Sequence, residues 1–269
     1  EPKQIQIGKL LKLDAMTKIA ADDKRIKGIA VVPTMWVGRR KVFADGTDEL
    51  SGRCVCRGDI HSKTYDVSAN QAYSPVTRNS SSNSIDAVAC LRDQNCEQYD
   101  LTAAYLQGKQ LECERTLNRA PPGFRDVDER GVELLWWMNA PLYGQTDAGA
   151  ILYRTFCEKM SGEPHALPRC ANEPCVFSAG FGKHGRDRVT NCLYVDDGRI
   201  CSDPTPAGVD AHAKVKAKLN EFAIKFGTVN QTDDMFLGSN RKVASPGTCK
   251  VYAETYIDLQ IKRYAKGDI

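Results

Sequence analysis

Hydrophobic positions along this chain recur with two periods, one typical of strands and one typical of helices. A β-branched and aromatic run over residues 29–37 predicts a strand, and a turn at residues 44–47 leads to a second strand near residues 53–57. Residues 209–226 carry apolar side chains every three or four positions, which predicts an amphipathic helix. The same periods predict helices over residues 85–96 and 146–160, and strands over residues 96–103, 134–138, 175–178 and 189–195.

The order of these elements, with strands and helices interspersed, indicates an α+β fold around an antiparallel sheet. Residues 1–29 are rich in lysine and predict a short helix or a mobile leader outside the core. No internal repeat and no long linker divides the rest of the chain. We therefore expect one large domain or two ordinary ones.

Composition narrows the class of protein. The chain has 269 residues, is 42% hydrophobic and carries a formal net charge of +3, which excludes an intrinsically disordered chain. No apolar run reaches the roughly 18–20 residues that span a bilayer, so we expect no membrane partner. The chain begins without methionine or a signal peptide, and we expect it to be part of a longer protein.

The 11 cysteines are scattered, and no two of them are separated by two residues, which argues against a disulfide framework. Free thiols in a reducing cytosol or nucleus are the favoured interpretation. A zinc site made of a loose group of nitrogen and sulfur ligands is a less favoured alternative to free thiols. Its members are His165, Cys170, Cys175 and His184.

Two adjacent carboxylates, Asp196 and Asp197, end the apolar run 192–195 and precede Gly198. This pattern predicts a hairpin turn at residues 196–198. Because alternate side chains of a strand point to opposite faces, only one of the two carboxylates is expected to face a metal ion directly. A solvated turn without a metal is the alternative.

Asp100 lies within the otherwise apolar segment 98–106, where a carboxylate is costly unless it is paired or bound to a metal. If this strand lies beside the 194–197 hairpin, Asp100 and Asp196 converge. Carboxylate oxygens without Cys or His nearby suit Mg²⁺, with Mn²⁺ as a substitute. Two such ions would support phosphoryl or nucleotidyl transfer.

These motifs, together with others in the same order, resemble the reverse transcriptase domain of Ty1/copia-type retrotransposons over residues 31–265. Residues 98–108 are closely similar to the first catalytic-aspartate motif of that family. Residues 145–149 depart from the Lys-Gln-Ala-Pro sequence that is usual there. The other similar segments are 36–37, 45–47, 51–58, 73–76, 121–124, 140–144, 173–177, 193–197 and 236–238.

The resemblance implies a role for each matching site residue. Asp100, Asp196 and Asp197 would be the catalytic, metal-binding carboxylates. Arg53 and Arg57 would bind the triphosphate of the incoming nucleotide, with a solvated strand face as the alternative. The remaining implied roles are Tyr105 beside the sugar 2′ position, Tyr143 and Gly144 against the nucleotide or template base, and Phe236, Leu237 and Gly238 at the primer terminus.

The resemblance also implies a right-hand polymerase core with fingers and palm, and with a thumb that is absent or rudimentary. The implied activity is RNA-directed DNA synthesis, with an RNA template, a DNA primer and dNTPs as partners. The implied location is the cytoplasm, in a retrotransposon particle, or the nucleus. The expected boundaries are residues 1–29 for the leader, 30–84 and 109–145 for the fingers, 85–108 and 146–240 for the palm, and 241–269 for the start of a connection or thumb.

Two other functions share some of these motifs. A catalytically inactive, nucleic-acid-binding relic of a decayed element would have the same fold. A metal-dependent nuclease would need further acidic or His ligands, and the sequence near the two motifs offers none. The glycine-rich segment 180–185 predicts a hairpin loop rather than a dinucleotide site, because strand-like rather than helical sequence follows it. The stripe of Lys214, Lys216 and Lys218 predicts a solvated helix face.

Overall fold

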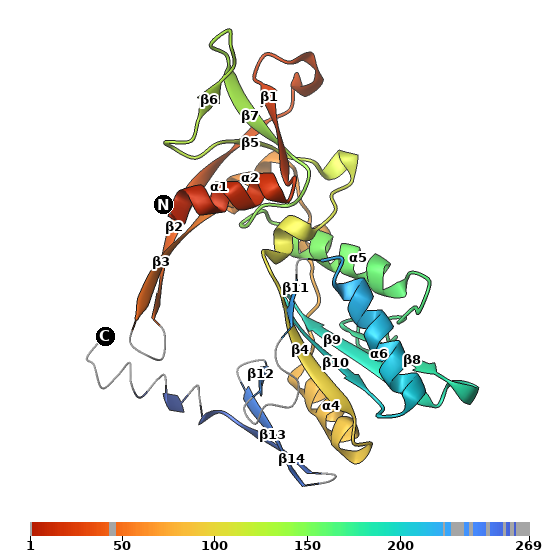
Figure 1. The fold of residues 1–269 in the computed structure, drawn as a ribbon. Helices are drawn as coiled ribbons and strands as arrows, with labels where there is room; N and C mark the ends of the chain where they lie inside the picture. The colour runs from red at the N-terminus through yellow and green to blue at the C-terminus, as the bar shows by residue number, and fades with distance from the viewer. Residues whose placement is uncertain are drawn as a thin grey trace. The chain divides into compact units, whose positions relative to one another are not determined.

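The computed structural model confirms an α+β fold with several sheets and few helices (Figure 1). It describes residues 2–42, 47–222, 224–226, 234–236, 239–245, 248–254, 257–258 and 261. The helices are α1 Pro2–Lys12, α2 Gly58–Thr64, α3 Ala69–Ala72, α4 Asn79–Leu91, α5 Ala148–Ser161 and α6 Pro206–Leu219. The strands are β1 Met16–Ala20, β2 Val31–Val42, β3 Asp48–Cys56, β4 Asn95–Leu101, β5 Leu117–Arg119, β6 Asp126–Val127, β7 Glu133–Met138, β8 Val176–Phe181, β9 Asp187–Tyr194, β10 Asp197–Ser202, β11 Ile224–Phe226, β12 Asp234–Phe236, β13 Ser239–Ser245 and β14 Thr248–Tyr252. Within the residues so described, no helix is both long and apolar enough to cross a bilayer.

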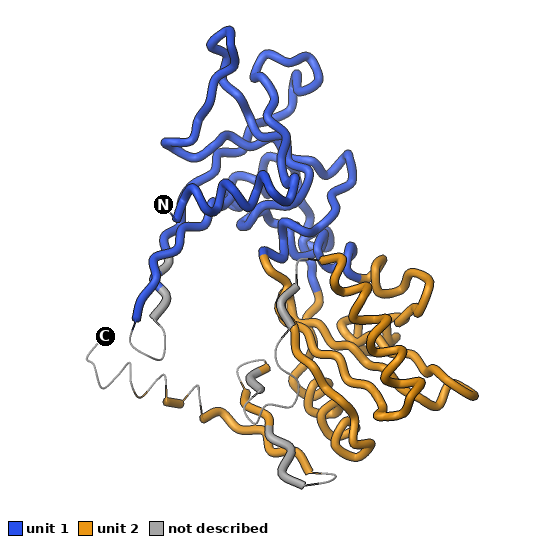
Figure 2. The backbone as a smooth tube through the Cα atoms, in the orientation of Figure 1, with its two compact units in different colours: residues 1–74, 103–156 blue, residues 75–102, 157–269 orange. Residues whose placement is uncertain are grey.

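Two compact units make up the chain, and each combines two separate stretches of sequence (Figure 2). Unit 1 consists of residues 1–74 and 103–156, and unit 2 consists of residues 75–102 and 157–269. The assignment of fingers, palm and thumb to particular residues stays a prediction.

Unit 1 is built on a mixed sheet in the order β1-β7-β5-β2-β3, with β6 paired to β7. Strands β2 and β3 form a long hairpin in which Trp36 lies opposite Cys54, and β2 runs parallel to β5. The fully buried side chains of Val32, Met138 and Leu142 lie in the core of this unit. The two strands predicted on either side of residues 44–47 are therefore confirmed as paired neighbours.

The N-terminal segment belongs to the core of unit 1, although the sequence predicted that residues 1–29 lie outside it. Leu10 of α1 is fully buried in the same cluster as Met16 of β1. Strand β1 pairs antiparallel with β7, so that Met16 lies opposite Met138. The physical reason is that β1 supplies hydrogen bonds to an edge of β7 that would otherwise be unpaired, while α1 buries Leu10 against the core.

Unit 2 is built on an antiparallel sheet in the order β11-β4-β10-β9-β8. Helix α4 packs on one face, where Ala89 contacts Cys96 of β4. Helix α6 packs on the other face, where Lys216 donates a hydrogen bond of 2.5 Å to Glu97. Cys96 and Glu97 are neighbours in β4, and neighbouring strand residues point to opposite faces. The sheet therefore has a helix on each side (Figure 1).

A buried ion cluster attaches α4 to the rest of unit 2. Asp86 of α4 accepts hydrogen bonds from Arg199 of β10 and, at 2.6 Å, from Arg241 of β13. The side chain of Asp86 is only 2% exposed. Arg241 also donates to Ser82 Oγ at 3.1 Å. The cluster joins α4 to the main sheet and to the three-stranded sheet β12-β13-β14.

A second polar network attaches α6 to the opposite face of the sheet. Ser202 Oγ lies 2.8 Å from His212 Nδ1, and His212 Nε2 lies 3.3 Å from Glu97 Oε2. Burial lowers the pKa of His212, because the charged imidazolium is costly to remove from water, and Glu97 opposes this effect. Ser202 is fully buried. The Ser-His-Glu arrangement is therefore a structural contact and not a hydrolytic site.

The lowered pKa of His212 predicts that the protein loses stability in mild acid. The neutral imidazole contributes its full stability above the unfolded-state pKa of about 6.5, and this contribution is lost as the pH falls toward the lower folded-state pKa. Urea denaturation at about pH 7.5 and about pH 5.5 should show a smaller acid-induced loss of unfolding free energy in His212→Gln than in the wild type. Equal losses in the two proteins would contradict the prediction.

The helix predicted over residues 209–226 is shorter than expected and starts earlier. Helix α6 begins at Pro206. Thr205 is its N-cap residue, and Thr205 Oγ1 accepts a hydrogen bond from the Gly208 backbone N–H. It ends at Leu219, and residues 224–226 form β11, with Phe226 opposite Tyr99 of β4. Pairing at the open edge of β4 thus overrides a helical spacing that continues in the sequence. The glycine-rich segment 180–185 lies at the β8–β9 hairpin, as predicted.

Candidate active site

The three predicted catalytic aspartates lie together at one end of the sheet in unit 2. Asp100 is in β4, and Asp197, the first residue of β10, is its direct cross-strand partner. Asp196 immediately precedes Asp197, in the turn between β9 and β10. The Leu101 backbone N–H donates a hydrogen bond of 2.7 Å to the Asp196 carbonyl. The prediction that the two acidic motifs lie on neighbouring strands is confirmed by this register.

The hydrogen-bond pattern places Asp100 and Asp197 at a close pair of the ladder. Because Leu101 and Asp196 are a hydrogen-bonded pair, the adjacent pair, Asp100 and Asp197, is a non-hydrogen-bonded one. Cα atoms of such pairs are typically about 4.5 Å apart and their side chains share a face. The two carboxylates therefore project from the same side of the sheet.

The turn itself is one residue earlier than the sequence predicted. It consists of Val195 and Asp196, so Asp197 belongs to the strand. Val195 has a φ of 57°, in the left-handed region that a β-branched residue rarely adopts. Such a conformation costs on the order of 1–3 kcal/mol and persists only where the surroundings impose it. Asp197, rather than Asp196, is therefore the ladder partner of Asp100.

A buried tyrosine supports this pair of strands from the opposite face. Tyr99 lies across from Gly198, and its ring occupies the space that a side chain at position 198 would need. Its hydroxyl donates a hydrogen bond of 2.8 Å to Asn191 Oδ1 on β9. Tyr99 and Asn191 are both buried. The neighbours of both Asp100 and Asp197 are thus fixed by packing.

The electrostatics of the cluster favour a bound cation. The pKa of Asp197 is raised to about 6, first by partial removal of the carboxyl from water and then by the negative charges of Asp196 and Asp100. A divalent cation would relieve this repulsion. Mg²⁺ commonly uses one or two protein carboxylates and takes its other ligands from water and substrate phosphates. The oxygen-only donor set of the three aspartates fits that preference.

No complete protein cage for a metal is formed in the part of the chain that the structure describes. Neither the aspartates nor any other group of three or more His, Cys, Asp or Glu side chains there is arranged to hold an ion by itself. This applies equally to the four residues considered for zinc. Any Mg²⁺ at the aspartates would therefore depend on ligands from substrate and solvent.

The predicted nucleotide-binding residues lie in unit 1, and the structure brings only some of them together. The guanidinium of Arg53 stacks over the ring of Tyr143, at 5.0 Å from its centroid. The ring of Tyr105 meets that of Tyr143 edge-on at 5.2 Å. Arg57 is held instead by Asp59 through two hydrogen bonds of 2.8 and 2.7 Å. Of the two arginines predicted to bind phosphate, Arg57 is therefore already paired with a carboxylate.

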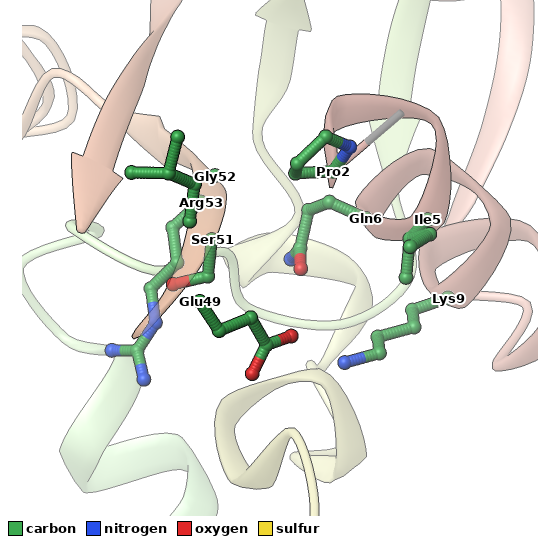
Figure 3. Close-up of a pocket in the computed structure, with 9 residues that line it drawn as sticks. Pro2, Ile5, Gln6, Lys9, Glu49, Ser51, Gly52 and Arg53 are labelled. Carbon is green, nitrogen blue, oxygen red and sulfur yellow. The ribbon is translucent and has the colours of Figure 1, made fainter. Parts of the chain in front are cut away.

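Arg53 also lines a hollow between α1 and β3, of about 280 Å³, which Figure 3 shows. Lys9 of α1 is at the same hollow, and so is the carboxylate of Glu49. The side chain of Arg53 thus lies at an open surface of unit 1 rather than in its core.

Gly144 has a structural reason to be glycine. Its φ is 82°, and a Cβ at this position would lie 2.4 Å from the carbonyl oxygen of Cys56. The Cys56 backbone N–H donates a hydrogen bond of 2.7 Å to the carbonyl of the preceding residue, Tyr143. This close backbone contact accounts for Gly144, and its predicted contact with a nucleotide or template base stays a prediction.

The predicted primer-contact segment is described only at its first residue. The ring of Phe236 is 2% exposed and packs with Val176 and Cys192 in the core of unit 2. Leu237 and Gly238 lie outside the described residues. The role of this segment at a primer terminus stays a prediction.

Sequence reasoning did not identify the residues that support the site. Tyr99 and Gly198 each stand beside a predicted catalytic aspartate, but only the strand register shows that they face each other. Asp86 interrupts an apolar helical pattern, and such an isolated carboxylate is a usable signal for a buried ion pair. Its partners could not have been identified, because they come from two distant strands.

Comparison with known proteins gives two similarities. A family model described as reverse transcriptase (RNA-dependent DNA polymerase) matches residues 22–265. The retrovirus-related Pol polyprotein from transposon TNT 1-94 of Nicotiana tabacum is 28% identical over 174 residues. That alignment covers 64% of this chain and 12% of the tobacco polyprotein. The chain therefore spans a small part of the relative it matches.

Proposed function

The chain belongs to the reverse transcriptase (RNA-dependent DNA polymerase) family, and on this premise we propose that its aspartate cluster catalyses nucleotidyl transfer onto a primer. The substrates would be dNTPs, a DNA primer and an RNA template, as in a copia-like retrotransposon. The observation that carries the proposal is the cross-strand pair of Asp100 and Asp197 next to Asp196. Unit 2 would then be the palm, and unit 1 would supply the fingers.

Asp100, Asp196 and Asp197 would hold Mg²⁺, or Mn²⁺ in its place. The chemistry that the ion supplies when bound is neutralisation of negative charge on the reacting phosphate and hydroxyl oxygens. The carboxylates bind it in their ionised form, and Asp197, with a pKa of about 6, is mostly ionised at neutral pH. The packing of Tyr99 against Gly198 would keep β4 and β10, and with them Asp100 and Asp197, in register.

The residues of unit 1 would bind the incoming nucleotide. Arg53 would bind its triphosphate, because a guanidinium forms paired hydrogen bonds with phosphate oxygens. Tyr105 would crowd the 2′ position of the sugar and so favour deoxynucleotides. Arg57 would contribute only after releasing Asp59, since both of its donors to that carboxylate are engaged.

Primer extension on poly(rA)/oligo(dT) with Mg²⁺ tests this function. Asp196→Asn should lower dNTP incorporation by about 100-fold or more, because it removes a charge that the metal site requires. Asp210→Asn is the matched control, since Asp210 is an exposed carboxylate of α6 paired with Lys214, and it should keep wild-type activity. Equal activity of the wild type and Asp196→Asn would refute the catalytic assignment. An inactive wild-type chain that still binds nucleic acid would favour the inactive relic.

A further inference from the structure

Two buried thiols face each other on the strands that carry the aspartates. Cys96 of β4 and Cys201 of β10 are direct cross-strand partners, and both pack against Ala89 of α4. We propose that Cys96 and Cys201 are an oxidisable dithiol, a site at which two-electron oxidants of the peroxide class join β4 to β10 through a disulfide.

The ladder geometry suits a disulfide at this pair. Close and wide pairs alternate along an antiparallel ladder, and Leu101 with Asp196 is a hydrogen-bonded pair. Five positions further along the ladder, Cys96 and Cys201 are therefore a non-hydrogen-bonded pair, in which Cα atoms are typically about 4.5 Å apart. Disulfides form across Cα separations of roughly 4.4–6.8 Å. The bond can therefore form without a shift in register.

The two thiols differ in a way that gives each a separate role. The pKa of Cys96 is lowered, first by a hydrogen bond from Cys201 and also by the positive charge of Arg199, against the effect of burial. The pKa of Cys201 is raised well above its usual value by the same hydrogen bond and by burial. Cys96 is thus the nucleophile and Cys201 the resolving thiol. By contrast, burial raises the pKa of Cys192, on the neighbouring strand, to about 12.

The chemistry balances with hydrogen peroxide as the oxidant. The Cys96 thiolate attacks one peroxide oxygen and breaks the O–O bond, and the departing hydroxide takes up a proton to become water. Cys96 is then a sulfenic acid. The Cys201 sulfur attacks the Cys96 sulfur, forms the S–S bond and releases a second water. Two electrons pass from the two thiols to one peroxide.

A second thiol pair in unit 2 provides an internal comparison. Cys90 of α4 and Cys249 of β14 are hydrogen-bonded to each other, and both are partly exposed. Burial and the neighbouring Cys249 raise the pKa of Cys90 to about 11. Solvent exposure favours oxidation of the Cys90–Cys249 pair. The lowered pKa of Cys96 and the cross-strand pairing favour oxidation of the Cys96–Cys201 pair. We expect the close cross-strand placement of Cys96 and Cys201 to outweigh the greater exposure of Cys90 and Cys249.

The location of the pair gives the disulfide a structural consequence. On each strand, four positions separate the cysteine from the aspartate, so the Cys96–Cys201 pair and the Asp100–Asp197 pair lie on the same face of the sheet. The bond would therefore hold β4 against β10 in the register that places the two aspartates opposite each other. The modification can be read directly from the protein, whether or not the chain has polymerase activity.

The test is disulfide mapping of the reduced, folded chain after treatment with hydrogen peroxide. After alkylation of free thiols and digestion, a peptide linking Cys96 to Cys201 should form about 10-fold faster than one linking Cys90 to Cys249, and dithiothreitol should reverse it. In Cys201→Ser the linked peptide should disappear, and Cys96 should be recovered as a sulfenic acid trapped by dimedone.

Three outcomes would overturn the proposal. The first is that Cys96 and Cys201 both remain alkylatable after a treatment that oxidises the exposed Cys113. The second is that the Cys90–Cys249 link forms first. The third is that the Cys96–Cys201 link forms only after the chain is unfolded in urea, which would show that the folded ladder does not promote it.

Discussion

Gly198→Ala is expected to destabilise unit 2 by about 3 kcal/mol, although it adds a single methyl group. A Cβ at position 198 would lie 1.9 Å from Cζ of the Tyr99 ring and 2.3 Å from its hydroxyl oxygen. The ring cannot yield easily, because it is 3% exposed and its hydroxyl is bonded to Asn191. The strands that carry Asp100 and Asp197 would have to separate locally, so nucleotidyl transfer should fall as well.

Chemical denaturation of Gly198→Ala beside Gly38→Ala measures this effect. Gly38 lies in β2, and a Cβ there meets no atom within 4 Å, so its replacement should change stability by no more than about 1 kcal/mol. Combining Gly198→Ala with Tyr99→Leu should recover part of the loss, because the smaller side chain frees the space above position 198. A Gly198→Ala variant as stable as Gly38→Ala would show that the tyrosine ring is not fixed.

Asp86→Ala is expected to destabilise the protein by about 3–5 kcal/mol, the cost of removing one partner from a buried ion cluster. Asp86 is the shared acceptor of Arg199 and Arg241, whose side chains are 9% and 4% exposed. Without it, two guanidinium groups remain in the interior with no carboxylate bonded to them. The same substitution at Asp210, which is exposed and paired with Lys214 four residues away, should cost about 0.3–0.5 kcal/mol.

Replacing all three charged residues of the cluster shows how much of the stability loss comes from uncompensated buried charge and how much from lost packing. The triple variant Asp86→Leu, Arg199→Met and Arg241→Met should be markedly more stable than Asp86→Ala, because no buried charge is left uncompensated. Urea denaturation of the wild type, Asp86→Ala and the triple variant makes the comparison. A triple variant as unstable as Asp86→Ala would assign the loss to packing instead.

Most of the regular structure could be predicted from local sequence. The strands at β7 and β9 and the helix at α5 follow from apolar periodicity, because their buried faces impose a period of two or of 3.6 residues on the sequence. The end of α6 could not be predicted in this way. The helical spacing continues to Phe226, but the free edge of β4 recruits residues 224–226 as a strand.

The candidate site shows the same division. The residue types and order around Asp100 and Asp196 were sufficient to indicate a Mg²⁺ site with carboxylate ligands, because a carboxylate in an apolar strand needs a counterion. They placed the turn one residue too late, since adjacent Asp residues and a glycine form a plausible turn in any register. Only the pairing of β4 with β10 makes Asp197 the partner of Asp100.

Local spacing along the chain thus determined the α+β class and the identity of the acidic motifs, because both depend on neighbours within a few residues. The support for those motifs was decided by tertiary contacts. Three of these contacts join segments about 100 or more residues apart: Tyr99 over Gly198, Asp86 between two arginines, and Cys96 opposite Cys201. Such pairings depend on the free energy of the whole folded sheet. A short stretch of sequence does not determine that free energy by itself.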